Sequence, residues 1–283
     1  MEFLPASQLI RSAAEDGYAV PAFSVWNAET ASTVLRVASD CRAPVILMNG
    51  ICELVVMSPD LMATAIRAVA GAYDIPAALH LDHGDSMVVV DSCIAAGYTS
   101  VMLDYSTKPF AENTAALRLV VEKAHPRGIT VEGEIGAVGR ADDATGEGQK
   151  ASTLTDPGQV RAYVEQTGID MVAVSIGNAH GNYPSLPKLD FELLAALHEA
   201  AGIPLVLHGG SGTPDEDIRK AISLGISKVN IASELVNIVR QTHLDQWNAG
   251  KRLWVAMSVA DAMEAMAKVV ARWIHRTGAA GRA

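Results

Sequence analysis

The sequence concentrates titratable side chains in one short stretch, LHLDHGD, from Leu79 to Asp85. This stretch ends an apolar run, and it places Asp82 directly before His83. A carboxylate can carry a proton, and a neutral imidazole can bind a divalent metal ion. His80 stands two residues before Asp82, on the same side of an extended chain, and we expect it to be structural rather than a ligand. The stretch therefore predicts acid–base chemistry beside a metal site.

Two other histidines occur in glycine-containing segments that follow apolar runs: His180 in IGNAHGNY and His208 in LHGGSG. Three neutral imidazoles, from His83, His180 and His208, with a fourth coordination position left open are typical of catalytic zinc. Imidazole also suits iron and cobalt, and there is no HExxH motif, so zinc is the preferred metal among open alternatives. The remaining histidines fall in helical segments, where we expect structural roles: His125, His198, His243 and His275.

A phosphate site is indicated by two further segments. HGGSGTPDED provides Gly209, Gly210, Ser211 and Gly212 ahead of a predicted helix, and NIASE adds donors at Asn230 and Ser233. Glycine lets backbone N–H groups approach an anion closely, and a helix N-terminus adds positive potential. Two glycines before a helix are also a common turn, so the string alone is weak evidence. Its position beside a candidate metal ligand favours the phosphate interpretation.

These residues follow short apolar, β-branched runs, each succeeded by a segment of helical periodicity. This alternation is typical of parallel strands joined by helices. Helix signals include residues 27–41, 85–97, 109–128, 156–168 and 213–225, several of which open on Asp, Asn or Thr and end at Gly. Eight β/α units predict an α/β fold, a TIM (β/α)8 barrel, in which the carboxyl ends of the strands hold the active site. The predicted strands are residues 19–25, 44–50, 76–84, 100–106, 129–136, 170–177, 203–210 and 227–233.

The composition limits the partners. With 283 residues, 49% of them hydrophobic, the chain can form one barrel domain over residues 1–283. No apolar run is long enough to span a membrane, and the N-terminus does not have the pattern of a secretory signal, so we expect a cytoplasmic protein. Three cysteines without CxxC spacing indicate core thiols. A net charge of −10 argues against nucleic acid and favours small-molecule partners.

With these residues placed, the chain resembles the zinc-dependent (class II) ketose-bisphosphate aldolases, in particular the tagatose-bisphosphate and shorter fructose-bisphosphate branch. The resemblance covers nearly the whole length. The matching motifs are YAVPAF, LHLDHG, SVMLDYS, PFAEN, VEGEIG, TDP, AHGNY, LHGGSG, KVNIASEL and the terminal GAAGRA.

This resemblance implies cleavage of a ketose 1-phosphate or 1,6-bisphosphate to dihydroxyacetone phosphate and an aldehyde. It implies that His83, His180 and His208 bind zinc, with Glu134 and Asp104 near the metal. Asp82 would take the proton of the C4 hydroxyl and return it in the reverse reaction. Relatives often use a monovalent cation, Na⁺ or K⁺, and commonly form homodimers or homotetramers. The residues expected to hold the substrate are Gly181, Gly209, Gly210, Ser211, Asn230, Ile231, Ala232 and Ser233.

The glycine- and acid-rich segment of residues 136–152 has the composition of a mobile loop that could close over substrate and supply a second acid. The family pattern places a glutamate where this chain has Asp142, which is followed by Asp143. We therefore expect Asp142 to be the loop acid, and Glu147 is the alternative.

Several residues depart from the family pattern around the distal end of the substrate. Val236 replaces a basic residue that reaches the 6-phosphate of a neighbouring subunit's substrate. Losing that cation would remove a charge-assisted contact of about 1.5 to 3 kcal/mol, unless Arg140 or Arg240 replaces it. The identity of the aldehyde and the sugar stereochemistry therefore stay open. The other departures are Ser24, Trp26, Ala232 and the pair Asn49–Gly50.

Three alternative functions compete with this interpretation. A Schiff-base aldolase needs a lysine inside the barrel mouth, but no lysine ends a predicted strand, and Lys228 begins one. A metal-dependent hydrolase barrel usually has HxH on its first strand, and AFSVWN has no histidine. A non-catalytic barrel subunit that partners an active aldolase is favoured by the changes at Asp142 and Val236, and disfavoured by retention of the three histidines and Asp82.

Overall fold

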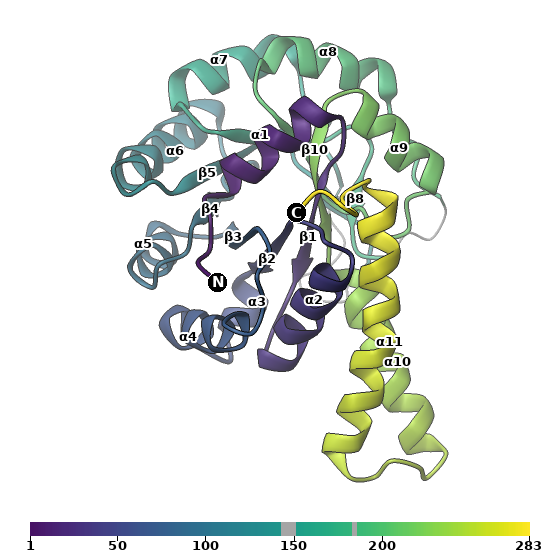
Figure 1. The fold of residues 1–283 in the computed structure, drawn as a ribbon. Helices are drawn as coiled ribbons and strands as arrows, with labels where there is room; N and C mark the ends of the chain where they lie inside the picture. The colour runs from purple at the N-terminus through teal and green to yellow at the C-terminus, as the bar shows by residue number, and fades with distance from the viewer. Residues whose placement is uncertain (143–150, 183–185) are drawn as a thin grey trace.

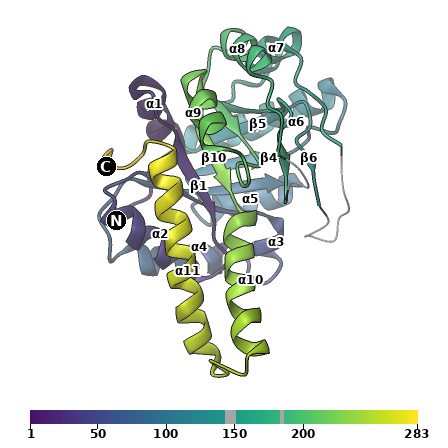
Figure 2. The same cartoon turned by 90° about the vertical axis from the view of Figure 1, so that its right-hand side faces the viewer.

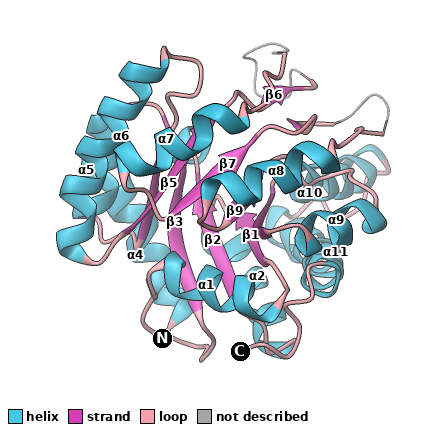
Figure 3. Ribbon diagram, turned by 90° about the horizontal axis from the view of Figure 1, so that it is seen from above, coloured by secondary structure: helices cyan, strands magenta, loops and turns pink. Residues whose placement is uncertain are grey.

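The computed structural model describes residues 1–142, 151–182 and 186–283. Eight parallel strands close into a barrel in the order β1-β10-β9-β7-β5-β4-β3-β2, with helices around it (Figure 3). Each predicted strand is present, which confirms the TIM barrel. The strands are β1 (Val20–Ser24), β2 (Val45–Asn49), β3 (Ala77–Gly84), β4 (Ser100–Leu103), β5 (Thr130–Ile135), β7 (Met171–Val174), β9 (Leu205–Leu207) and β10 (Ile226–Ile231).

A helix follows every barrel strand, because each crossover must return the chain to the amino end of the barrel. Several helices start and stop where the sequence predicts. Asn27 accepts a hydrogen bond from the Thr30 N–H at the start of α2, and Gly168 ends α7 in the left-handed conformation. These crossover helices are α2 (Ala28–Asp40), α4 (Pro59–Ala70), α5 (Met87–Ala95), α6 (Phe110–Ala124), α7 (Pro157–Thr167), α8 (Phe191–Ala201), α9 (Asp215–Ser223) and α10 (Ser233–Asn248).

Further helices go beyond the eight expected units. α1 (Ala6–Asp16) precedes the first strand, the short α3 (Ile51–Leu54) follows β2, and α11 (Val255–Arg276) follows α10, while His125–Arg127 form a 3-10 turn. At the start of α1, the Leu4 N–H donates to the Ala77 carbonyl at 2.8 Å, and the Ser7 N–H donates to Thr130 Oγ1 at 2.9 Å. Because Ala77 and Thr130 begin their strands, α1 covers the amino end of the barrel and leaves the carboxyl end accessible.

Helices α10 and α11 form a hairpin that extends away from the barrel (Figures 1 and 2). Leu235 is the buried residue of α10, and Ile238 and Val239 pack partly buried against the core. Leu253, Trp254 and Val255, at the far end of the hairpin, are 69%, 77% and 61% exposed. An apolar group of this kind on a projecting element is typical of a protein–protein contact.

The segment predicted as a mobile loop contains local structure at its described end. Gly139–Arg140 form β6, which pairs in parallel with β8 (Ala179–His180) outside the barrel, and Ala137 pairs with Thr153. No strand is predicted here from the sequence, because two-residue strands are too short to show a periodic pattern. Asp143 and Glu147 lie outside the described residues. Among the described residues, no helix has the length and apolar character needed to cross a bilayer.

Candidate active site

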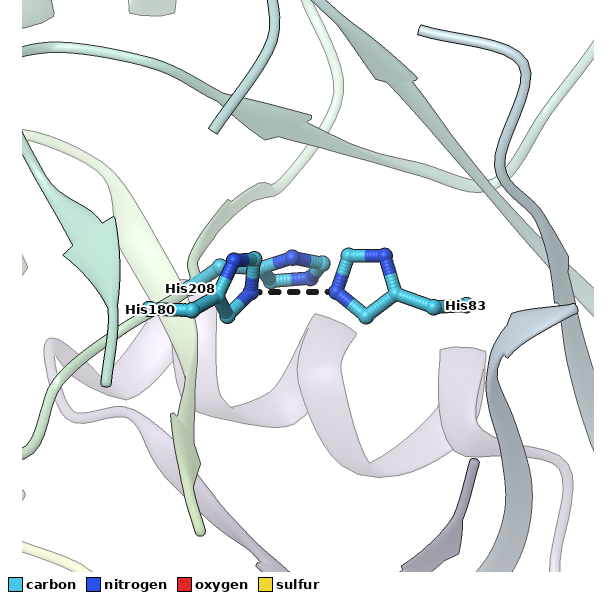
Figure 4. A group of neighbouring side chains, drawn as sticks. All are labelled: His83, His180 and His208. Atoms are coloured by element: carbon cyan, nitrogen blue, oxygen red, sulfur yellow. Dashed lines mark hydrogen bonds between the residues drawn. The ribbon is translucent and has the colours of Figure 1, made fainter. Parts of the chain in front are cut away.

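Three imidazoles from separate strand ends meet at the barrel mouth (Figure 4). His83 belongs to β3, His180 to β8, and His208 follows β9. Their ring centroids are 4.7 Å apart for His83 and His180, 4.6 Å for His83 and His208, and 5.5 Å for His180 and His208. Each ring offers one nitrogen to a cluster whose candidate ligand atoms all lie within 4.8 Å of one another. The structure thus brings together the three histidines that the sequence singled out.

A hydrogen bond at the second nitrogen orients each ring. His83 Nδ1 contacts Asp104 Oδ2 at 2.7 Å, His180 Nδ1 contacts the Gly139 carbonyl at 3.2 Å, and His208 Nε2 contacts Glu132 Oε1 at 2.8 Å. Since those partners are acceptors, the bonded nitrogens carry the protons. The nitrogens left for a ligand are Nε2 of His83, Nε2 of His180 and Nδ1 of His208.

The free nitrogens fit a metal ion. His208 Nδ1 is buried without a hydrogen-bond partner, and so is Glu134 Oε2, which lies 3.3 Å from it. Nε2 of His83 and Nε2 of His180 face each other at 3.1 Å. Buried polar atoms normally have partners, and a cation among these atoms would satisfy all of them. A second group of possible ligands joins His83 to Asp104 and Glu134.

Charges shape the site before any metal binds. Burial disfavours the His83 imidazolium, but the Asp82 and Asp104 carboxylates outweigh it and raise the pKa of His83 to about 10. Burial, with His83 beside it, holds the pKa of His180 well below its usual value. The protonated His83 ring can therefore donate a hydrogen bond from its Nε2 to Nε2 of the neutral His180 ring, at 3.1 Å. A divalent ion would take the place of that proton.

A bulge explains how Asp82 and His83, although adjacent, both face the mouth. Successive strand residues normally point to opposite sides. Between the pairs Leu81–Val101 and Gly84–Leu103, β3 has one residue more than β4. His83 adopts a φ of +46°, in the left-handed region that non-glycine residues rarely occupy. The extra residue re-aims His83 beside Asp82, and a sequence pattern of period two could not reveal it.

Asp82 belongs to neither group of possible metal ligands found among the described residues. Its Oδ1 accepts a hydrogen bond from Asn230 Nδ2 at 2.9 Å. Burial raises the pKa of Asp82, but the positive charges of His83, His208 and Lys228 outweigh it and lower the pKa below its usual value. An ionised, uncoordinated carboxylate next to a metal cluster can accept a proton.

Sequence reasoning gave Glu132 and Lys228 no role in the site. Both are fully buried, and Lys228 Nζ lies 2.9 Å from Glu132 Oε2. His80 also lies in this layer, 3.5 Å from Glu132 and hydrogen-bonded to Ser100, which agrees with a structural role. Glu132 and Glu134, and likewise Lys228 and Asn230, stand two residues apart on their strands. This spacing is the signal that could have placed both residues inside the barrel.

Two of the residues expected to hold the substrate, Gly181 and Ser211, line a cavity near the mouth. A cavity of about 410 Å³ is lined by Gly181, Asn182, Leu186, Ser211, Gly212, Glu234 and Asn237. Ser211 Oγ accepts the Glu234 N–H at 3.2 Å, so the cavity adjoins the start of α10. Helix α9, in contrast, has three acidic residues in its first turn, which oppose anion binding. The cavity thus adjoins the start of α10, whose first turn has one acidic residue, Glu234.

Other expected phosphate residues are constrained by the backbone. Gly209 has a φ of +65°, and a Cβ there would lie 2.0 Å from the Ala179 carbonyl oxygen. The Gly210 N–H donates to the Asn230 carbonyl at 3.2 Å, so it is engaged within the protein. Ile231 ends β10, and Ala232 and Ser233 begin α10.

The candidate loop acid lies beside the same cavity. Asp142 Oδ2 accepts hydrogen bonds from both the backbone N–H and the side-chain amide of Asn182, each at 2.7 Å. Asn237 Nδ2 in turn donates to Asn182 Oδ1 at 2.5 Å. Asp142 is thus held against the segment that follows His180.

The residues that depart from the family pattern around the distal end of the substrate lie in different surroundings. Asn49 is fully buried and bonded to the Val25 carbonyl and the Tyr98 hydroxyl, so its role is structural rather than functional. Ser24 is buried at the end of β1, and Trp26 packs partly buried against the core. Val236 is 45% exposed on α10, near the cavity-lining residue Asn237.

Comparisons with known proteins agree with this geometry. The family model of class II fructose-bisphosphate aldolase matches residues 5–282. The YdjI aldolase of Escherichia coli K12 superposes with a TM-score of 0.88 at 32% identity, covering 100% of both chains. A fructose-bisphosphate aldolase of Campylobacter jejuni gives a TM-score of 0.80 at 23% identity, covering 98% of this chain and 95% of its own, and supports the fold.

The fold and the site together define a (β/α)8-barrel enzyme with a candidate metal centre at its mouth. The chain belongs to the class II fructose-bisphosphate aldolase family. It is accordingly an aldolase, a carbon–carbon lyase of a metal-dependent class whose substrates are sugar phosphates.

Proposed function

We propose that the enzyme is a zinc-dependent aldolase that reversibly cleaves a ketose 1-phosphate or 1,6-bisphosphate, of the tagatose- or fructose-bisphosphate kind. The products would be dihydroxyacetone phosphate and an aldehyde. The observation that carries the proposal is the convergence of three imidazole nitrogens beside the uncoordinated carboxylate of Asp82.

His83, His180 and His208 would hold the zinc ion, because three imidazoles with an open position suit a catalytic site. Asp104 orients His83, and Glu134 supplies a carboxylate within reach of the same position. When bound, zinc supplies Lewis-acid stabilisation of the negative charge that develops when the C3–C4 bond breaks. A monovalent cation, Na⁺ or K⁺, is a further expected cofactor.

Asp82 would remove the proton from the C4 hydroxyl in cleavage and return it to the aldehyde oxygen in condensation. General acid–base catalysis of this kind needs a carboxylate that is ionised, close to the metal and free of it. Asp142 would exchange the other proton, the one at the substrate carbon that loses its bond to C4. Its hydrogen bonds to Asn182 place it near His180, although Glu147 stays an alternative.

The ketose 1-phosphate would bind in the 410 Å³ cavity, where Ser211 and the start of α10 meet. Gly181 and Gly209 let the backbone come close to an anion, and the α10 N-terminus adds positive potential. The remaining proposed substrate contacts come from Gly210, Asn230, Ile231, Ala232 and Ser233.

We further propose that the chain acts in the cytoplasm as a homodimer or homotetramer. The exposed apolar end of the α10–α11 hairpin supports self-association, because a lone chain would leave Leu253, Trp254 and Val255 in water.

Metal removal tests the proposed function. After treatment with EDTA and removal of the chelator, condensation of dihydroxyacetone phosphate with an aldehyde panel should stop, and one equivalent of zinc should restore it. The panel should contain phosphorylated and neutral aldehydes, because Val236 stands where relatives have a basic residue that reaches the distal phosphate. Activity that survives metal removal would exclude the zinc mechanism, and a zinc-loaded protein inactive on every aldehyde would favour a non-catalytic partner subunit.

A further inference from the structure

We propose that Lys228 is a positioning residue for proton transfer: it fixes the side-chain amide of Asn230 so that the NH2 group faces Asp82. The inference rests on the proposed role of Asp82. Lys228 is the third residue of β10, points into the barrel and is fully buried. Its Nζ lies 2.7 Å from Asn230 Oδ1 and 2.9 Å from Glu132 Oε2.

The amide of Asn230 has one orientation that satisfies both neighbours. A lysine ammonium can only donate hydrogen bonds, and an ionised carboxylate can only accept them. With Oδ1 toward Lys228 and Nδ2 toward Asp82, both contacts are favourable. The flipped amide would place NH2 against the ammonium and oxygen against the carboxylate. Lys228 therefore determines which end of Asn230 meets the proton carrier.

This orientation has a direct consequence for Asp82. Asn230 holds Oδ1 at 2.9 Å, and across the described part of the chain Oδ2 receives no side-chain or backbone hydrogen bond. One oxygen is thus fixed and the other is left for a substrate hydroxyl. Without Lys228, Asn230 could rotate and the carboxylate would lose its anchor.

The second contact of Lys228 reaches the metal cluster. Glu132 accepts from Lys228 through Oε2 and from His208 through Oε1, at 2.9 and 2.8 Å. The His208 contact fixes the tautomer that leaves Nδ1 for the metal. A single buried ammonium therefore links the proton carrier and one metal ligand, from a position where it touches neither.

The role can be separated from a structural one because the reaction has two proton transfers. Solvent exchange at the reacting carbon of dihydroxyacetone phosphate swaps a carbon-bound proton for a deuteron through the loop acid, without Asp82. Condensation with an aldehyde requires Asp82 as well. A residue that acts through Asp82 must affect condensation far more than exchange, whereas general damage affects both.

The matched variants are Lys228→Met and Lys228→Gln. Both remove the charge and leave Glu132 without its cation, but only glutamine offers an N–H donor toward Asn230. We expect Lys228→Met to reduce the kcat of condensation by about 10²-fold, with deuterium exchange changed by less than about 5-fold. The kcat of condensation of Lys228→Gln should be at least about 10-fold higher than that of Lys228→Met. Equal loss of exchange and condensation, or no difference between Met and Gln, would overturn the proposal.

Loss of a buried charge partner can unfold a protein, so two measurements accompany the assays. Thermal melting of the metal-free variants and their zinc content establish that each is folded and loaded. A neutron diffraction map of the wild-type, metal-free protein shows the orientation of the Asn230 side-chain amide directly. It should show deuterons on Asn230 Nδ2 directed at Asp82 and a charged ammonium at Lys228. A flipped amide or a neutral amine would refute the inference even if no variant folds, and it would leave the proposed aldolase function untouched.

Discussion

At the scale of single residues, the site depends on side chains that are each held by a second contact. Asp104, Gly139 and Glu132 fix the tautomers of the three histidines, so that one nitrogen of each ring faces the same point. Loss of a partner of this kind typically weakens metal affinity by about 10- to 100-fold. The sequence singled out the three histidines, and the family resemblance placed Asp104 near the metal. The contacts of Gly139 and Glu132 depend on other strands and could not be predicted.

Asp82→Ala tests the division of labour between metal and proton carrier. Because Asp82 belongs to neither group of possible ligands in the described chain, the variant should bind zinc as the wild type does. Condensation should fall by about 10² to 10⁴-fold, while exchange of dihydroxyacetone phosphate protons continues. The measurements are the zinc content by mass spectrometry, the rate of condensation and the rate of proton exchange. Turnover within a few-fold of wild type would mean that another group carries the proton.

At the scale of elements, the end of β3 is the least regular part of the barrel and the most important for the site. Its bulge places His83 in the left-handed region, and Gly84 follows at once. A Cβ on Gly84 would lie 2.6 Å from the Met102 carbonyl oxygen, a backbone atom that cannot move aside without shifting β4. The sequence marks Gly84 only as a residue after a histidine, since a bulge depends on the partner strand.

Gly84→Ala should therefore disturb both stability and metal binding. We expect a loss of about 1 to 3 kcal/mol in the free energy of unfolding and weaker zinc binding, because β3 must shift under His83. The control is Gly71→Ala at the end of α4, where a Cβ meets its nearest neighbour at 3.6 Å and φ is −58°. Denaturant titration and zinc competition measure both effects. Equal behaviour of the two variants would contradict this account of β3.

At the scale of the whole molecule, the alternation of apolar runs and helical segments was enough to predict the eight-stranded barrel, because each unit has its own periodicity. Helix α1, the α10–α11 hairpin and the Lys228–Glu132 pair were not predicted. Helix α1 and the Lys228–Glu132 pair are defined by contacts between distant segments, α1 with β3 and β5 and β10 with β5, and the hairpin is defined by the packing of α10 on α11. Local patterns specify elements and strand ends, whereas partners across the barrel follow only from its closure.

The hairpin gives a prediction at this scale. Light scattering should show an assembly larger than the 29.8 kDa chain, and Trp254→Asp should shift it toward the single chain, because a charge at a 77% exposed apolar position disfavours burial in an interface. Leu119→Asp, on α6 of the barrel wall and 52% exposed, is the matched control and should leave the assembly intact. A monomeric wild-type protein, or an equal change in assembly size for both variants, would contradict a role for the hairpin in assembly.

The central claim concerns three imidazoles around one ion, and anomalous diffraction at the zinc absorption edge tests it most directly. Crystals of the zinc-loaded protein should show one anomalous peak about 2.0 to 2.1 Å from His83 Nε2, His180 Nε2 and His208 Nδ1, with Asp82 outside the coordination sphere. A mouth without an anomalous peak, or an ion bound by Asp82 in place of one of these rings, would contradict the account.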